Sequence, residues 1–171
     1  LFPAGMGAVT GVVLTMLPPG GTIALAGGAY YGHRQLFDHL RPWGVNVVEY
    51  DQTGPPPGGA DLILIEAPSN PMLTMPDFEA ATAHPAAVVC DATLSSPLRL
   101  RPLERGCDVS LHSATKVLAG HDDLIAGIVI VTTGWMPIDP LLSLAIGALI
   151  LVSSLRLLRE VNATGKSLLI T

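Results

Sequence analysis

The feature that most limits the possible folds is a series of short apolar runs separated by helical or loop-like segments. Runs of this length, bounded by glycine and proline, are typical of buried β-strands. The chain is 49% hydrophobic and only 13% charged, which suits a sheet that is buried on both faces. Apolar strands that alternate with helices predict a three-layer α/β/α domain with a mainly parallel sheet. We expect strands at 22–26, 45–50, 62–66, 86–90, 108–112 and 128–131, and helices at 4–17, 33–41, 76–84 and 141–160.

Polar residues follow two of these strands, at the sheet edge where parallel sheets hold ligands. Asp91 comes directly after the strand 86–90, and a carboxylate at the end of an apolar strand is unfavourable unless it is paired. Ser113, Thr115 and Lys116 follow the strand 108–112. Hydroxyls can bind phosphate and a lysine amine can form a Schiff base, so this combination suits a phosphorylated cofactor that carries a carbonyl group. The alternative interpretation of Lys116 is a surface lysine in a turn.

Three upstream segments carry similar but less specific signals. Gly5 and Met6 begin a glycine-rich helix, whose free backbone N–H groups could bind an anion, although glycine there could also serve packing. Tyr30 lies in a loop after the strand 22–26, where its ring could stack on a planar cofactor or plug the edge of the sheet. Asn70 stands between serine and proline, a setting in which asparagine commonly forms a turn.

The segment from His112 to Gly127 reads H-S-A-T-K-V-L-A-G-H-D-D-L-I-A-G. It resembles the signature of the Cys/Met-metabolism family of pyridoxal-phosphate (PLP) enzymes, which includes cystathionine synthases and lyases and methionine lyases. Further segments resemble the family in the expected order: A-G-M at 4–6, Y-Y-G-H-R-Q-L-F at 30–37, E-A-P-S-N-P at 66–71 and D-A-T at 91–93. Within these segments the chain departs from the family pattern at Ala4, His33 and Ala92, where serine, threonine and asparagine are usual.

The resemblance implies the large domain of the type I PLP-dependent transferase fold (aspartate aminotransferase-like), with residues 1–171 as the PLP-binding domain. Lys116 would hold PLP as a Schiff base and move the Cα proton of the substrate, while Asp91 would pair with the pyridine nitrogen. Tyr30, with Tyr31 as the fallback, would stack on the ring and protonate the leaving thiolate. No metal is implied. The cofactor-binding residues implied by the resemblance are Gly5, Met6, Tyr30, Asn70, Asp91, Thr93, Ser113, Thr115 and Lys116.

The function implied by the resemblance is that of a PLP-dependent carbon–sulfur lyase. Its substrate would be a sulfur-containing amino acid of the cysteine, cystathionine or methionine type, cleaved by α,β- or α,γ-elimination as in transsulfuration. Such a lyase could stand alone or form a domain of a larger biosynthetic protein. The alternatives are a γ-replacement enzyme such as a cystathionine γ-synthase, and an inactive large-domain fragment with a role in assembly. The sequence leaves the identity of the sulfur amino acid open.

Composition excludes some partners and compartments. The net charge of −5 and the absence of a basic run argue against nucleic acid. The apolar run 141–152 is too short to span a bilayer, which argues against a membrane partner. Cys90 and Cys107 have no metal-binding or CxxC spacing, so a disulfide framework is not expected and a cytoplasmic location fits.

The resemblance covers the middle of a family member. The chain begins with Leu1, so we expect a processed chain, an excised domain or a partial sequence. The N-terminal arm, with its Tyr-x-Arg pair for the neighbouring subunit, and the C-terminal domain, with the arginine for the substrate carboxylate, would then lie outside these residues. Arg156, Arg159 and Asn162 resemble the end of the family's large domain. A homo-oligomer, dimer or tetramer, that binds a small amino-acid substrate is expected.

Overall fold

A six-stranded sheet organises the computed structural model, which describes residues 1–120 and 124–131. The strand order is β2-β1-β3-β4-β5-β6. The first five strands are parallel, and β6 runs antiparallel to β5. The expected mainly parallel sheet is thus confirmed, with one antiparallel strand at its edge. The strands are β1 (Thr22–Ala26), β2 (Asn46–Tyr50), β3 (Leu62–Glu66), β4 (Ala87–Asp91), β5 (Val109–Ser113) and β6 (Gly127–Val131).

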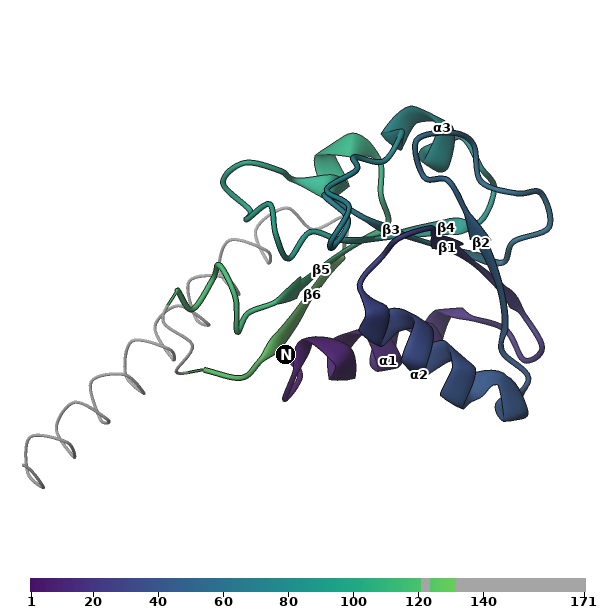
Figure 1. Cartoon of the computed structure of the whole chain (residues 1–171), viewed down its shortest axis with the longest axis horizontal. Helices are drawn as coiled ribbons and strands as arrows, with labels where there is room; N and C mark the ends of the chain where they lie inside the picture. The colour runs from purple at the N-terminus through teal and green to yellow at the C-terminus, as the bar shows by residue number, and fades with distance from the viewer. Residues whose placement is uncertain (121–123, 132–171) are drawn as a thin grey trace, which may run out of the picture. The chain divides into compact units, whose positions relative to one another are not determined.

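Helices cover both faces of this sheet, which gives the three layers expected from the sequence (Figure 1). The helices α1 (Gly5–Met16) and α2 (Tyr31–Leu40) lie on one face. The short helix α3 (Phe78–Thr82) and the 3-10 turn Pro102–Arg105 lie on the other face. The helix expected at 141–160 lies outside the described residues, as do Arg156, Arg159 and Asn162.

Strand side chains divide between the two faces because successive residues of a strand point in opposite directions. On β3, Leu62 and Leu64 pack with α1 and α2, whereas Ile63 and Ile65 pack on the side of α3. All four are buried, so β3 shows the continuous apolar run of a strand covered on both faces. The buried residues of α1 are Ala8, Val9, Val12 and Val13, one stripe along the helix.

Element boundaries differ from the sequence expectation at several sites. The helix α2 begins at Tyr31, two residues before the expected start, because the backbone N–H of His33 already donates to the carbonyl of Tyr30 at 3.0 Å. The helix α3 is shorter than the expected 76–84, since Asp77 caps it by accepting a hydrogen bond from the Ala80 N–H at 3.0 Å. Sheet pairing also extends β4 to Asp91 and β5 to Ser113. Both residues therefore end their strands rather than follow them.

Within the described ranges, none of the helices has the length and apolar character needed to cross a membrane.

Candidate active site

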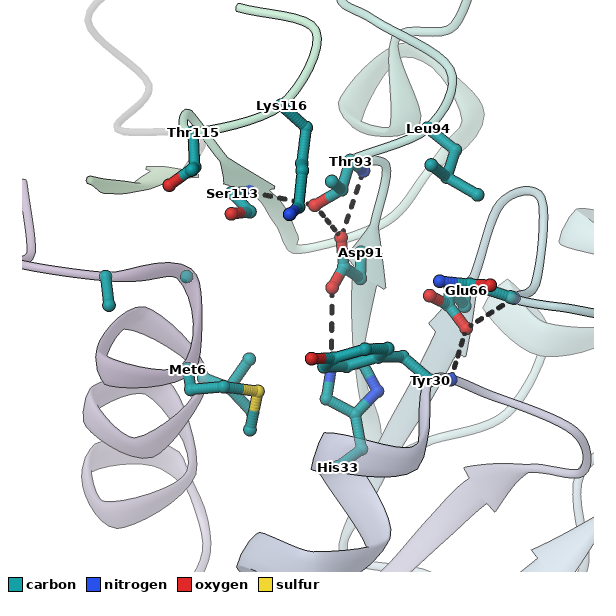
Figure 2. Close-up of a pocket in the computed structure, with 14 residues that line it drawn as sticks. Met6, Tyr30, His33, Glu66, Asp91, Thr93, Leu94, Ser113, Thr115 and Lys116 are labelled. Carbon is teal, nitrogen blue, oxygen red and sulfur yellow. Dashed lines mark hydrogen bonds and ion pairs between the residues drawn. The ribbon is translucent and has the colours of Figure 1, made fainter. Parts of the chain in front are cut away.

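A cavity of about 230 Å³ opens beside the carboxyl ends of the central strands. Its wall combines the first turn of α1, the start of α2, the ends of β3, β4 and β5, and the loops that follow them (Figure 2). All nine residues expected to bind the cofactor line it: Gly5, Met6, Tyr30, Asn70, Asp91, Thr93, Ser113, Thr115 and Lys116.

The start of α1 is fixed beside the end of β5 by the chain that precedes it. Phe2 and Gly127 exchange backbone hydrogen bonds, at 2.8 Å from Phe2 N to Gly127 O and 2.9 Å in return. Any side chain at Gly127 would collide with the carbonyl of Ala4, so only glycine allows this approach. The Ala4 cap offers no side-chain hydrogen bond, and the first turn of α1 has no acidic residue. Its free N–H groups therefore form a site that favours an anion.

Asp91 ends β4 and is almost fully buried. Its Oδ1 accepts two hydrogen bonds from Thr93, from the backbone N–H at 3.0 Å and from the hydroxyl at 2.5 Å. The same hydroxyl accepts the N–H of Ser113 at 2.8 Å, which ties β4 to β5. On the other side, Oδ2 lies 3.3 Å from Nε2 of His33. Burial by itself would raise the pKa of Asp91, but His33 and Thr93 together hold that pKa below its usual value. Asp91 is therefore an ionised carboxylate.

Glu66 is a second buried carboxylate, at the end of β3. Its Oε2 accepts the backbone N–H groups of Tyr30 at 2.8 Å and Asn70 at 3.1 Å. One oxygen thus fixes the loop before α2 and the loop after β3. Burial raises the pKa of Glu66, and the negative charge of Asp91 raises it further, whereas the two N–H groups and His33 lower it.

Tyr30 contributes the aromatic wall of the cavity. Its ring stands edge-on to that of His33, with centroids 5.8 Å apart and an interplanar angle of 85° (Figure 2). Tyr31, the fallback for the stacking role, is 65% exposed and does not line the cavity. A hydrogen bond with Tyr31, together with burial, raises the pKa of Tyr30. The Tyr30 phenol is therefore protonated at neutral pH and can act as a proton donor.

Lys116 lies in the turn after β5, where its backbone N–H donates to the backbone carbonyl of Ser113 at 3.2 Å. Its side chain extends into the cavity toward Ser113 and Thr93 (Figure 2). This placement favours the reactive interpretation over that of a surface lysine. Thr115, one position earlier, accepts the N–H of Ala126 at 3.3 Å through its hydroxyl.

Two ionisable cavity residues, His33 and Glu66, were not among the site residues expected from the sequence. Glu66 ends an apolar strand just as Asp91 does, so the argument against unpaired buried carboxylates could have identified it. His33 could have been noticed from the replacement of the usual threonine. In the described part of the chain, no group of three His, Cys, Asp or Glu side chains is arranged to hold a metal ion. Cys90 and Cys107 are buried free thiols.

The known proteins that this chain resembles include enzymes that act on amino acids. Over 139 residues it is 37% identical to the L-methionine gamma-lyase of Pseudomonas putida, covering 74% of this chain and 35% of that enzyme. It is also 32% identical to the L-alanine/L-glutamate racemase of Wolbachia pipientis wMel, covering 76% of this chain and 34% of the racemase. The chain therefore spans about a third of the length of these relatives.

Solved structures of similar proteins have the same arrangement of sheet and helices. The structure of cystathionine gamma synthase from Xanthomonas oryzae pv. oryzae, in complex with aminoacrylate and cysteine, has a TM-score of 0.70 and 36% identity, covering 76% of this chain and 36% of that one. This similarity shows that the sheet and its helices are the large domain of the type I PLP fold. Residues 1–153 match the family described as Cys/Met metabolism PLP-dependent enzyme. The chain belongs to this family, whose cofactor is pyridoxal phosphate.

Proposed function

We propose that residues 1–171 form the cofactor-binding large domain of a PLP-dependent carbon–sulfur lyase that acts on a sulfur-containing amino acid by α,β- or α,γ-elimination. The observation that carries this proposal is the convergence of Lys116, Asp91 and the first turn of α1 on one cavity. These groups are a primary amine, an ionised carboxylate and an anion-binding helix start.

The cavity fits the three reactive parts of PLP. Its phosphate would be held by the N–H groups at Gly5 and Met6, with the hydroxyls of Ser113 and Thr115 beside them. Gly5 provides the necessary space, because a side chain there would fill the approach toward Ser113. The carboxylate of Asp91 is the partner for a protonated pyridine nitrogen, and Lys116 is the amine for the aldehyde.

Bound PLP supplies an electron sink for the electron pair left when a bond to the substrate Cα breaks. Asp91 contributes by holding the proton on the pyridine nitrogen, which its lowered pKa allows because the carboxylate stays ionised. Thr93 contributes by fixing the orientation of Asp91 through its two hydrogen bonds to Oδ1. Tyr30 would cover one face of the ring.

Proton movements would fall to Lys116 and Tyr30. The Nζ atom of Lys116 would take the proton from the substrate Cα, a role that its position in the cavity supports. The phenol of Tyr30, protonated at neutral pH, would donate a proton to the departing sulfur. For a γ-leaving group a second proton must leave from Cβ, and Lys116 is again the base on the described wall. The amide of Asn70 would contact the 3′-oxygen of the cofactor and the substrate carboxylate.

Two other reactions share the first of these steps. A cystathionine gamma synthase is among the similar structures, which supports γ-replacement as the second candidate. A racemase of alanine and glutamate is among the relatives, and it too would begin with removal of the Cα proton. The three reactions differ in what happens next: release of a thiol, exchange of the γ-substituent, or return of the proton to the other face.

Product analysis of the complete gene product separates these reactions. We expect cystathionine or methionine to yield a 2-oxo acid, ammonia and a thiol, and cysteine to yield pyruvate, ammonia and hydrogen sulfide. Formation of a thioether from cysteine and an activated homoserine would establish γ-replacement instead. Loss of optical activity from alanine without release of thiol from any sulfur amino acid would overturn the lyase proposal. A protein that binds no PLP, judged by visible absorbance, would support the assembly role.

A further inference from the structure

His33 lies in the first turn of α2, and its imidazole is almost fully buried beneath the ring of Tyr30. Its Nε2 atom lies 3.3 Å from Oδ2 of Asp91. Neither ring nitrogen has a hydrogen-bond partner within residues 1–120 and 124–131. An imidazole carries at least one N–H, and a buried N–H requires an acceptor. Oδ2 of Asp91 is the acceptor within reach.

The two oxygens of Asp91 are used differently. Oδ1 already accepts the N–H and the hydroxyl of Thr93, whereas the described contact of Oδ2 is with His33. A carboxylate oxygen has two lone pairs, so Oδ2 can accept the imidazole N–H and still accept one more donor from the cavity. The imidazole and the cavity thus share this oxygen.

We propose that His33 is a positioning residue that donates its Nε2–H to Oδ2 of Asp91, so that an imidazole–carboxylate pair faces the pyridine nitrogen of the cofactor. The hydrogen bond between His33 and Asp91 rests on the geometry of the protein, and the effect of this pair on bound PLP rests on the proposed function. His33 has two effects on Asp91. It fixes the plane of the carboxylate from the side opposite Thr93, and it favours the ionised form.

The distance of 3.3 Å is longer than the 2.7–2.9 Å, approximately, of hydrogen bonds to charged groups. Hydrogen bonds in active sites are commonly long or poorly aligned without ligand and shorten when the ligand is bound. A small rotation of the imidazole would align Nε2–H with Oδ2. Burial raises the pKa of Asp91, and the neighbouring His33 and Thr93 lower it.

A titration of Asp91 must account for its other charged neighbours. The negative charge of Asp91 raises the pKa of Glu66 at the end of β3. Burial lowers the pKa of His112 on β5, and the charge of Asp91 opposes this shift. The Nε2 atom of His112 lies 3.3 Å from the hydroxyl of Ser110. Lys116 lines the same cavity. Variants at His33 leave all three of these groups in place, so a change in the titration reports on His33.

The first test uses the cofactor-free protein. Isotope-edited infrared spectroscopy with labelled aspartate, assigned by comparison with Asp91→Asn, follows protonation of the Asp91 carboxyl. We expect His33→Leu, which removes the donor, to shift the Asp91 midpoint to higher pH. His33→Gln keeps a neutral donor and should give a midpoint between that of His33→Leu and that of the natural protein. His39→Gln changes an exposed histidine of the same helix and is the control.

Equal midpoints in the natural protein and in folded His33→Leu would overturn the pairing. Nitrogen NMR of the labelled imidazole gives a second check, because the pairing requires the proton on Nε2. A proton on Nδ1 with Nε2 bare would overturn it as well.

The final measurement loads the protein with PLP labelled at the pyridine nitrogen. The pH at which this nitrogen loses its proton should differ between His33→Leu and the natural protein. If the pH at which the nitrogen loses its proton is unchanged while the Asp91 midpoint shifts, the pairing stands. Its proposed effect on the cofactor is then overturned. Failure of PLP to bind to the natural protein would instead count against the proposed function and leave the cofactor-free result standing.

Discussion

Gly5, the first residue of α1, packs directly against Ser113, the last residue of β5. A Cβ atom at Gly5 would lie 2.7 Å from Cβ and 2.9 Å from Oγ of Ser113, closer than real side chains approach. The helix start and the strand end are therefore in contact only because position 5 is glycine. The proposed phosphate site is built from this contact, since it brings N–H groups and a hydroxyl to the same point.

We predict that Gly5→Ala weakens PLP binding by about tenfold to a hundredfold, because displacing Ser113 removes about one or two hydrogen bonds to the phosphate. The matched control is Gly7→Ala on the same helix, where the added Cβ would lie 3.7 Å from the nearest atom, in Pro3. Binding titrations followed by visible absorbance measure both. Equal affinities for the two variants would place the phosphate elsewhere.

Lys116 is predicted to be the lysine that forms the covalent link with PLP. Borohydride converts a link between its Nζ and the cofactor aldehyde carbon into a stable secondary amine, which peptide mapping locates. The chain offers one internal control, Lys166, since these two are its only lysines. We expect the label on Lys116 in the natural protein and in Lys166→Arg, and no label in Lys116→Arg. A label retained in Lys116→Arg would refute the assignment.

Asp91→Asn should retain PLP but slow removal of the Cα proton by about two to four orders of magnitude, because an uncharged amide cannot hold the ring proton. Asp91→Glu keeps the charge but lengthens the side chain, and it should recover part of the rate. Single-turnover measurement of solvent deuterium entering Cα isolates this step. Near-normal exchange in Asp91→Asn would remove Asp91 from the proposed role.

The same carboxylate should influence acid stability. The pKa of Asp91 in the folded protein lies below its usual value of 3.8. The unfolded chain therefore binds the proton first as pH falls. The stability that Asp91 contributes is complete above its unfolded pKa and is lost as pH falls through the lower folded pKa. The stability difference between the natural protein and Asp91→Asn should shrink across that acidic window.

Much of this fold followed from the sequence because the strands are continuous apolar runs and the helix α1 has a clear buried stripe. The resemblance of residues 30–37 to the family also favoured Tyr30 over Tyr31, and Tyr30 is the one that lines the cavity. What the sequence did not supply were the links between strands. Glu66 pairs in register with Asp91, and Asp91 with Leu111, and these pairings depend on a strand order that local patterns do not specify. The hydrogen bonds of Thr93 with Asp91 and Ser113, and that of Glu66 with the Tyr30 N–H, depend on that order.

Exposed apolar side chains on loops are consistent with the expected homo-oligomer. Met72, Leu98, Val117 and Ile125 are exposed, with Leu98 at 90%, and an oligomer interface would remove such side chains from water. We expect at least a dimer for the complete gene product and concentration-dependent association of the 171-residue chain. Light scattering across a range of concentrations measures this. A monomer at every concentration, with lyase activity, would contradict the oligomer proposal.

Glu66 should affect stability with the opposite pH dependence to that of Asp91. Burial raises its folded pKa above the usual value of 4.5. As pH rises past that value, the unfolded chain loses the proton while the folded protein retains it. Stability therefore falls with rising pH until the folded pKa is passed. The cause is an ionised carboxylate that is buried near Asp91, although it accepts two backbone N–H groups.

Glu66→Gln tests this directly because its amide oxygen can still accept the N–H groups of Tyr30 and Asn70. We predict that Glu66→Gln matches the natural protein in strongly acidic solution and becomes progressively more stable than it toward neutral pH. Glu66→Ala leaves both N–H groups without their acceptor and should be destabilised at every pH, by about 1–3 kcal/mol for each buried group. Thermal unfolding of the three proteins from acid to neutral pH separates the effect of the buried charge from that of the two backbone hydrogen bonds. A constant stability difference between Glu66→Gln and the natural protein would show that Glu66 does not titrate as its burial requires.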